Sequence, residues 1–406
     1  MIPEVLTVRT ERLDFDGELL GWTSPEQPLA FLRNGEGIVG FGERTTFRHH
    51  TGDRITELAA WWRELCSHAE VHDDVRMPGT GLVAFGSFAF SDASAEPSIL
   101  TVPAVIVGRR DGVTWITRVD GGFPVEPSAP RPDLTATLAP GAMTPEMFES
   151  AVRHSLLRIR SGSVSKVVVA RDLVGSVGRG TDRRGPLARL AAAYPDTFTF
   201  AMEGLIGSSP ETLVRVNGGD VSARILAGTA RRYPDAATDA HAASGLANSS
   251  KNLGEHDLAV RSVLDVLAPH ATDVTTTEPY PLRLPNLWHL ATDLHGSLVP
   301  GNTALDLVAA LHPTAAVAGT PTAAAVTAIA ELEPFDRGRY AGPVGWVDAS
   351  GDGEWAIALR CAQIDESGQV TAWAGAGIVA DSDPAAELAE TELKFRPIVE
   401  ALRPVS

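Results

Sequence analysis

Apolar residues recur along the chain with two different periods, and each period predicts a different kind of element. After Thr144, a good N-cap, and Pro145, a good first helical residue, apolar positions follow at helical spacing until Gly162. The β-branched run Lys166–Arg171 comes directly afterwards and predicts a strand. By the same criteria we expect further helices at 236–267, 303–310, 322–332 and 385–402, and strands at 81–90, 104–107, 198–202, 212–216, 342–347, 355–359 and 370–373.

These strands cluster between helices without a regular alternation of strand and helix. Such an order favours a mixed α+β (α/β) fold with large, mainly antiparallel sheets and helices outside. One Pro-rich stretch, 123–143, has the composition of a linker. We expect it to cross the surface of one body, so that residues 1–406 form a single domain.

Composition and charge narrow the functional classes. The 406 residues are 44% hydrophobic and carry a net charge of −17, which argues against a nucleic-acid partner and against an anionic membrane surface. No signal peptide is visible at the N-terminus, and the weakly polar stretch 309–330 is too interrupted to span a membrane. Two cysteines, Cys66 and Cys361, make no disulfide framework and fit a reducing cytoplasm. An anionic substrate would need local positive charge or a divalent metal in so acidic a protein.

The C-terminal block is the richest in candidate chemistry. A strand-like approach leads to a turn of small residues that includes Gly375 and Gly377, and a Ser-Asp-Pro sequence then starts a helix. On this helix Glu387, Glu390 and Lys394 share one face. Two carboxylates and an ammonium beside a glycine backbone could hold a hard cation and an anionic ligand together. The glycines also fit a dinucleotide-binding fingerprint, but too little chain follows for a strand-helix-strand unit.

Five other side chains are candidates for chemistry, and three of them have an ordinary interpretation as well as a functional one. Lys166 is either an edge lysine reaching water or a partly buried general base. Glu211 is either solvated or a carboxyl delivered by a turn to a buried strand, and Glu255 is either half of a surface ion pair or a metal ligand. His289 lies between large apolar residues, as a satisfied core histidine does. Arg360, expected at a strand end, could clamp a carboxylate.

Two short stretches carry weaker signals. Residues 226–229 are expected to form a compact loop in which Gly228 and Thr229 offer a backbone N–H and a hydroxyl to an anion. The group Cys66, His68, His72 and Asp73 resembles a metal cluster, but a helix face explains it more simply.

Taken in order, these stretches resemble the motifs of the chorismate-utilising enzyme family, which includes isochorismate, salicylate, anthranilate and aminodeoxychorismate synthases. The resemblance is strong over 144–402, weak from about residue 79, and slight over 1–78. The motifs are Lys166-Val-Val-Val-Ala-Arg, Ser209-Pro-Glu-Thr-Leu, Leu226-Ala-Gly-Thr, Glu255-His, Leu287-Trp-His-Leu-Ala-Thr, His312-Pro-Thr-Ala-Ala-Val-Ala-Gly, Arg337-Gly-Arg-Tyr-Ala-Gly-Pro-Val-Gly-Trp, Gly351-Asp-Gly-Glu-Trp and Ala374-Gly-Ala-Gly-Ile-Val.

The resemblance implies a fold of two large sheets with helices outside, like that of anthranilate synthase component I, and a Mg²⁺-dependent site for chorismate, a dicarboxylate. It implies Mg²⁺ ligands at Glu255 and Glu390, with Glu387 in or near the shell. Mg²⁺ typically takes one or two protein carboxylates and leaves positions for substrate and water. The implied substrate contacts are Gly228, Thr229, His289, Ala316, Arg360, Gly375, Gly377 and Lys394.

Three positions indicate which reaction such an enzyme would run. Lys166 replaces the neutral Gln of ammonia-using relatives and points to activated water or to a direct role of the lysine as nucleophile. Ala227 replaces the nucleophilic Lys of enzymes like aminodeoxychorismate synthase, and Ala316 replaces the Thr typical of salicylate and anthranilate synthases. We therefore expect an isochorismate synthase, an isomerase of menaquinone or siderophore biosynthesis, acting as a monomer without a glutaminase subunit. Salicylate synthase is the alternative within the family, and a non-catalytic binding protein is the alternative outside it.

The expected mechanism assigns one proton transfer to each catalytic side chain. Lys166 would take a proton from the water that attacks ring carbon two of chorismate, and Glu211 would protonate the hydroxyl leaving carbon four. Three positions depart from the family pattern: Asn252 and Gly254 near Glu255, and Leu388 beside Glu387. None of them removes a proposed ligand.

Overall fold

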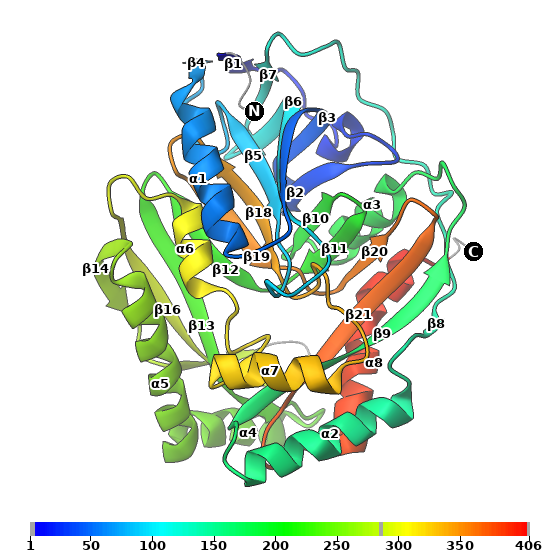
Figure 1. Ribbon diagram of the computed structural model, residues 1–406, viewed down its shortest axis with the longest axis vertical. Helices are drawn as coiled ribbons and strands as arrows, with labels where there is room; N and C mark the ends of the chain where they lie inside the picture. Colours follow the sequence, from blue (N-terminus) through cyan, green and yellow to red (C-terminus); the bar gives the residue numbers. More distant parts are fainter. Residues whose placement is uncertain (1–4, 284–286, 404–406) are drawn as a thin grey trace.

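A continuous network of backbone hydrogen bonds joins the strands into one large curled sheet, and helices pack around it (Figure 1). The computed structural model describes residues 5–283 and 287–403, without the side chains of Ala227, Thr229, Arg231, Lys251, Glu255 and Leu287. Among the described strands, pairing is antiparallel except between β1 (Leu6–Arg12) and β4 (Ala69–Asp73). The mixed fold with a mainly antiparallel sheet is the class expected from the sequence.

The sheet divides into two arms at β6 (Ser98–Arg110), which pairs with β3 along one edge and with β5 and then β7 (Val113–Val119) along the other. The first arm runs through β3 (Glu36–His49), β2 (Leu29–Arg33), β10 (Phe198–Met202), β11 (Leu205–Ser209), β20 (Cys361–Ile364), β21 (Gln369–Ile378) and β9 (Lys166–Ser176), whose far edge carries β8 (Ala139–Pro140) and β17 (Gly319–Thr320). The second runs through β5 (Val83–Ser87), β18 (Pro343–Asp348), β19 (Gly353–Ile357), β12 (Thr212–Asn217), β13 (Asp220–Arg231) and β16 (Leu287–Leu298), which also pairs with β14 (Ala271–Thr276) and β15 (Tyr280–Arg283).

Two of the places where the chain crosses between the two arms are adjacent, and together they form the seam of the sheet. One crossing joins β11 to β12 and the other joins β19 to β20. The Ile357 N–H donates to the Glu211 carbonyl at 3.0 Å, and the Ser208 N–H donates to the Arg360 carbonyl at 3.2 Å. The seam therefore places Glu211 and Arg360 side by side although about 150 residues separate them in the sequence.

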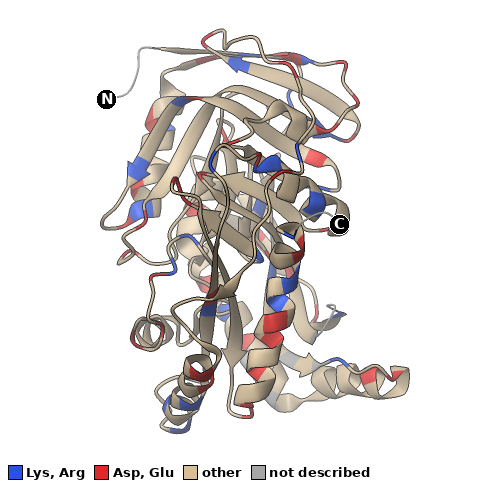
Figure 2. Ribbon diagram, turned by 90° about the vertical axis from the view of Figure 1, so that its right-hand side faces the viewer, with Lys and Arg blue, Asp and Glu red and all other residues tan. Residues whose placement is uncertain are grey.

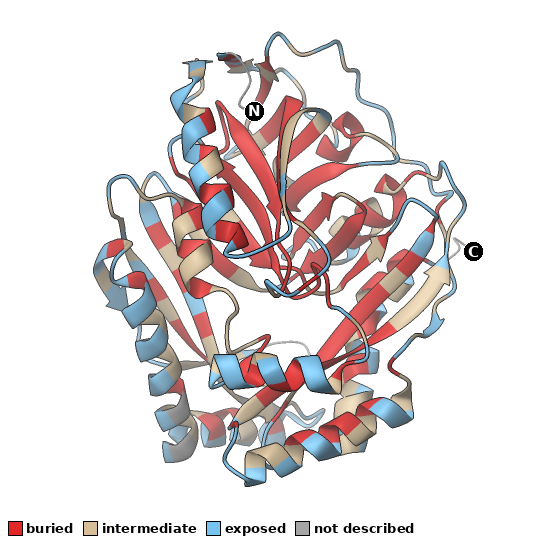
Figure 3. Ribbon diagram, viewed as in Figure 1, coloured by how far each residue is buried: buried red, intermediate tan, exposed pale blue. Residues whose placement is uncertain are grey.

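Helices cover the outer faces of both arms, and Figure 3 shows buried positions along the strands with exposed positions on the outward helix faces. Helices α2 (Pro145–Arg160), α3 (Arg184–Ala193) and α8 (Pro384–Ala401) pack on the first arm. Helices α4 (Ala236–Asn248), α5 (Ser250–Leu267) and α6 (Ala304–Leu311) pack on the second, α1 (Arg54–Ser67) lies on β3 and β6, and α7 (Thr322–Leu332) follows β17. A short 3₁₀ helix spans Leu19–Trp22. No described helix is long and apolar enough to span a membrane.

Helix starts were predicted well, because capping is local. The Thr144 hydroxyl accepts from the Met147 N–H, and Asp383 caps α8 through the Ala386 N–H. The single helix expected over 236–267 is wrong, since Ser249 adopts an extended conformation and caps the start of α5. This cap divides the segment into α4 and α5.

Two expected turns proved to be strands. Residues 226–229 lie inside β13, paired with β16, and Gly228 forms an irregularity there with a φ of +81°. Residues Gly375 and Gly377 lie inside β21 and not in a turn. In both places a glycine lets another part of the protein approach the strand closely. Sequence composition alone cannot distinguish such a strand from a turn. The helix face expected to explain residues 66–73 is wrong, because α1 ends at Ser67 and both His72 and Asp73 lie in β4. No described group of three or more His, Cys, Asp or Glu side chains could hold a metal.

The Pro-rich stretch 123–143 is tied to the rest of the molecule by a buried ion pair. Asp182 and Arg184 lie 2.7 Å apart and are almost fully buried. Arg184 donates to the Ser128 carbonyl at 3.1 Å, and Asp182 accepts from the Arg131 N–H at 3.0 Å. Farther along the stretch, β8 pairs with β9.

Candidate active site

The side chain of Lys166 packs against β21 at Gly377, a position that has no side chain. Lys166 opens β9 as predicted, and β9 pairs along its length with β21. A Cβ added at Gly377 would lie only 3.0 Å from Lys166 Cε. The glycine therefore provides the space that the lysine chain occupies, which explains why a strand interior carries this otherwise unfavourable residue.

A second ammonium reaches the same strand from α8, along which Figure 2 shows acidic and basic positions close together. Lys394 Nζ lies 2.5 Å from Glu390 Oε1 and donates to the Gly375 carbonyl at 2.8 Å. Burial lowers the pKa of Lys394, while the Glu390 carboxylate opposes that shift. The predicted face of α8 thus points at the glycine-containing part of β21.

Glu211 stands at the seam among three cations. Burial raises the pKa of Glu211, and the charges of Lys166, Lys394 and Arg360 only partly oppose the shift. The carboxyl consequently keeps its proton to a higher pH than an exposed glutamate does. It is suited to donate a proton to a leaving group.

Arg360 adopts a φ of +50°, in the left-handed region that residues with a side chain rarely occupy. Burial lowers the pKa of Arg360, and the nearby Tyr340, Glu390 and Glu211 oppose that change. Strained backbone of this kind is found where the surrounding structure fixes a functional side chain. Here it turns the guanidinium at the seam toward the carboxylates of the site.

His289 lies on β16 and contacts the irregular part of β13. Its Nδ1 is 3.3 Å from the Gly228 carbonyl, so it is hydrogen-bonded, as the ordinary interpretation of this histidine required. Burial, followed by the charge of Lys166, lowers the pKa of His289 to about 4. The imidazole of His289 therefore stays neutral near physiological pH, on the second arm and within the electrostatic influence of Lys166 and Lys394.

Glu387 stands one helical turn before Glu390 on α8. Burial raises the pKa of Glu387, and the negative charge of Glu390 acts in the same direction. A divalent cation would remove this repulsion, so the pair fits a hard metal ion. The side chains of Glu255 and Thr229 lie outside the described part of the structure, and their roles stay predictions.

The structure adds one residue that sequence analysis did not single out. The Tyr340 hydroxyl would lie 3.1 Å from a Cβ added at Gly375, and its ring stacks on Trp373 with centroids 5.8 Å apart. Burial raises the pKa of Tyr340, and the positive charges of Arg337 and Arg360 only partly oppose that rise. Tyr340 is the last residue of the motif Arg337-Gly-Arg-Tyr, but nothing in that motif distinguishes a tyrosine of the site from a tyrosine of the core.

Ala316 is half-buried in the segment between α6 and β17. This segment reaches the site through β9, because the Val168 N–H donates to the Ala318 carbonyl at 2.8 Å. The role of Ala316 in substrate orientation also stays a prediction.

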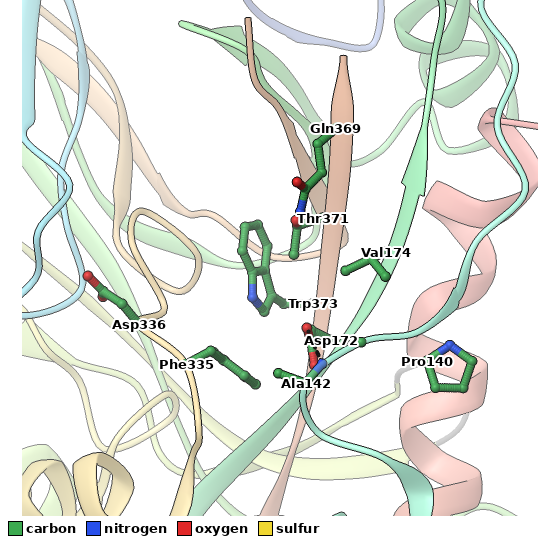
Figure 4. A pocket seen from close by; sticks show the side chains of 10 residues that line it. Pro140, Ala142, Asp172, Val174, Phe335, Asp336, Gln369, Thr371 and Trp373 are labelled. Carbon is green, nitrogen blue, oxygen red and sulfur yellow. Dashed lines mark hydrogen bonds between the residues drawn. The ribbon is translucent and has the colours of Figure 1, made fainter. Parts of the chain in front are cut away.

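A groove of about 580 Å³ lies farther along the same face of β9 and β21 (Figure 4). Its walls include Asp172 and Val174 from β9, Thr371 and Trp373 from β21, and Phe335. Trp373 separates it from Tyr340. None of the predicted site residues lines this groove, so the candidate site is the cluster at the seam.

Comparison with known proteins gives a consistent result. The family described as chorismate binding enzyme matches residues 125–403. Isochorismate synthase DhbC of Bacillus subtilis (strain 168) is 39% identical over 271 residues, which cover 64% of this chain and 68% of that protein. Isochorismate synthase MenF of the same strain is 28% identical over 96% of this chain and 88% of its own length. The structure of MenF from Escherichia coli has the same fold, with a TM-score of 0.76 at 24% identity, covering 99% of this chain and 96% of that one.

Proposed function

Because this chain belongs to the chorismate binding enzyme family, we propose that it is an isochorismate synthase, which isomerises chorismate to isochorismate. The observation that carries the proposal is that the charges of Lys166, Lys394 and Arg360 all act on the buried carboxyl of Glu211 at the seam. Relatives that bear the name isochorismate synthase match over most of the chain. No neutral Gln stands at 166 to suit an ammonia-using reaction.

In the proposed reaction, one water enters and one water leaves. Lys166, in its neutral form, removes a proton from a water whose oxygen bonds to ring carbon two. The ring double bonds shift, the bond from carbon four to its hydroxyl breaks, and Glu211 gives that hydroxyl a proton. The product is an isomer of the substrate, and a second proton transfer returns Lys166 and Glu211 to their starting states. General acid and base groups of this kind contribute about 10²–10⁴-fold each.

The cationic groups of the site suit a dicarboxylate. Arg360 presents a planar guanidinium, which pairs with a carboxylate through two parallel hydrogen bonds. Lys394 and the Tyr340 hydroxyl flank Gly375, whose missing side chain leaves room for that hydroxyl beside the strand. Together these groups focus positive charge inside a protein with a net charge of −17, and so overcome its general repulsion of anions.

Mg²⁺ is part of the proposal, with Glu390 and Glu387 on α8 and Glu255 on α5 as the residues that would hold it. Burial raises the pKa of Glu387, and the negative charge of Glu390 adds to the rise, which supports a cation at this place. When bound, Mg²⁺ would neutralise the ring carboxylate of the substrate and draw off charge as the double bonds shift. Lys394 contacts Glu390 at 2.5 Å, so metal and ammonium would share that carboxylate.

Salicylate synthase is the alternative within the family, since it adds loss of pyruvate to the same first step. Ala316 lacks the hydroxyl that would help to orient the enolpyruvyl group for elimination, which favours stopping at isochorismate. Incubation with chorismate and Mg²⁺, followed by assays for isochorismate, pyruvate and salicylate, distinguishes the two. Isochorismate without pyruvate supports the proposal, whereas pyruvate in proportion to the chorismate consumed supports the alternative. No turnover at all would favour a non-catalytic binding protein.

Weaker observations bear on the compartment, the oligomeric state and the pathway of the enzyme. Cys66 and Cys361 are both free thiols, which suits a cytoplasmic protein. We propose a monomer that needs no glutaminase subunit, because water and not ammonia is the nucleophile. Its product would supply menaquinone or siderophore synthesis, and the genes neighbouring its own would show which of the two.

A further inference from the structure

Near Lys166, the outer edge of β9 is completed by a strand, β17, for only two residues. There β17 pairs with Lys166 and Val167, and the Ser165 N–H donates to the Thr320 carbonyl at 2.7 Å. After one further bond, from the Val168 N–H to the Ala318 carbonyl, the neighbouring chain turns away. The next polar groups of this buried edge, the Val168 carbonyl and the Ala170 N–H, must find other partners.

A buried ion pair supplies those partners. Glu333 Oε1 accepts from the Ala170 N–H at 2.7 Å, and Arg337 Nη2 donates to the Val168 carbonyl at 2.9 Å. Arg337 Nη1 also donates to the Val317 carbonyl at 2.9 Å. The two side chains thus continue the hydrogen-bond ladder of β9 where β17 stops.

The two side chains of the pair are hydrogen-bonded to each other. Arg337 donates to both carboxylate oxygens of Glu333, at 2.6 and 2.8 Å, and the two side chains are 3% and 1% exposed. Burial alone would lower the pKa of Arg337, but the charge of Glu333 and its hydrogen bonds raise it. Buried ion pairs are often no more stabilising than apolar residues of similar volume. Global stability is therefore an incomplete explanation for this one.

The position of the pair indicates what it does. Val168 and Ala170 follow Lys166 on the same face of β9, and they pair with Gly377 and Gly375 on β21. The Arg337 guanidinium also lies 5.8 Å from the centre of the Tyr340 ring. The pair consequently fixes the strand that carries the proposed base and contacts the tyrosine beside the substrate site.

We propose that Glu333 and Arg337 are positioning residues for the reaction: they hold β9 so that Lys166 reaches the water from which it would remove a proton. This inference rests on the proposed function. Neither residue touches the reacting atoms, and both act through the backbone of Val168 and Ala170.

The test compares variants of this pair with variants of the other buried pair, Asp182–Arg184, which lies 2.7 Å apart and holds the Pro-rich stretch. Glu333→Gln keeps an oxygen for the Ala170 N–H but loses the charge, and Arg337→Lys keeps the charge but loses the two-pronged contact. Asp182→Asn and Arg184→Lys are the matched controls. Far-ultraviolet circular dichroism and thermal melting identify the folded fraction of each protein.

Two readouts decide the inference. For folded Arg337→Lys and Glu333→Gln we expect kcat for chorismate to fall about 10²-fold, as for a misplacement of roughly 1 Å, with KM changed less than about threefold. Arg337→Met should lose more than Arg337→Lys. The controls should melt at lower temperature but keep kcat. Wild-type kcat in the folded pair variants, or an equal loss in the controls, would overturn the inference.

The second readout needs no substrate. The rate at which acetic anhydride labels the Lys166 amine, followed by peptide mass spectrometry, should change several-fold in the pair variants and not in the controls. If wild-type protein does not convert chorismate, the proposed function fails, and this labelling rate still decides whether the pair positions Lys166. An unchanged labelling rate would overturn the inference in that case too.

Discussion

Substitution of Gly377 by Ala tests whether the position of Lys166 limits the reaction. The φ of Gly377 is not in the left-handed region, so alanine fits the backbone. Its Cβ would lie 3.0 Å from Lys166 Cε, whereas ordinary contact begins at 3.4 Å, so the lysine chain must move by 0.4 Å (3.4 − 3.0). Only the flexible end of a side chain stands in the way, and the fold should remain intact.

The size of the effect follows from that shift. If a misplacement of about 1 Å costs about 10²-fold, one of about 0.4 Å costs roughly five- to tenfold, or about 1 kcal/mol in the barrier. We expect the loss in kcat, with KM for chorismate within about twofold, because the groups proposed to hold the carboxylates do not move. Continuous assay of chorismate consumption at saturating substrate measures it.

Gly245→Ala is the matched control. Gly245 lies in α4 and has no atom within 4 Å of its added Cβ. Alanine there should raise the free energy of unfolding by about 1 kcal/mol and leave kcat unchanged. If folded Gly377→Ala protein turns over at the wild-type rate, Lys166 does not act from the place where the structure puts it.

The other predictions concern the acid, the base, pH and metal. Lys166→Ala and Glu211→Gln should each lower kcat by about 10²–10⁴-fold with the fold intact, and Glu211→Gln should still bind chorismate in calorimetry; near-normal turnover of either would remove its assigned role. The raised pKa of Glu211 predicts that wild-type kcat falls as pH rises through that pKa, because the acid must be protonated, and a flat alkaline limb in the pH–rate profile would contradict it. Burial lowers the pKa of His312 from 6.5 to about 4, so between these pH values the unfolded chain binds a proton that the folded protein does not. The free energy of unfolding should therefore fall by up to about 3 kcal/mol as pH drops from 6.5 to 4. Urea unfolding should show this loss in the wild type and less of it in His312→Gln. Mg²⁺ at 100 times its Kd should raise the free energy of unfolding of the wild type by about 2.7 kcal/mol. A variant with Gln at both Glu387 and Glu390 should show no such rise, and an equal rise in both proteins would place the metal elsewhere.

Local features of the fold were predictable because local chemistry determines them. The strand at Phe198–Met202 and the helix at Thr322–Leu332 have the predicted bounds, and the caps at Thr144 and Asp383 start their helices as expected. Each of these signals lies within a few neighbouring residues. Hydrophobic period, capping and Pro at the first helical turn suffice to find them.

Contacts between distant segments were not predictable in this way. Nothing near Glu211 or Arg360 in sequence indicates that two crossings of the chain hydrogen-bond to each other at the seam. Gly375 and Gly377 were misread because small residues mark turns, whereas here they leave space for the Tyr340 hydroxyl and the Lys166 chain. Such roles depend on which strands become neighbours, and no short-range pattern encodes that.

The resemblance to a family supplied what the local patterns lacked. It selected Lys166, Glu211, Arg360 and Lys394 as members of one site before any contact between them was known, and the structure brings these four together. It did not select Tyr340 or the pair that caps the β9 edge. Those residues act through packing and backbone contacts, which a motif does not record.

The most direct measurement is the fate of chorismate incubated with the protein and Mg²⁺ in water enriched in ¹⁸O. The account predicts isochorismate that carries one ¹⁸O atom, in the hydroxyl at carbon two, because Lys166 activates a solvent water at that position. Lys166→Ala protein should give none. Unlabelled isochorismate, release of pyruvate in proportion to chorismate consumed, or no consumption of chorismate would contradict the account.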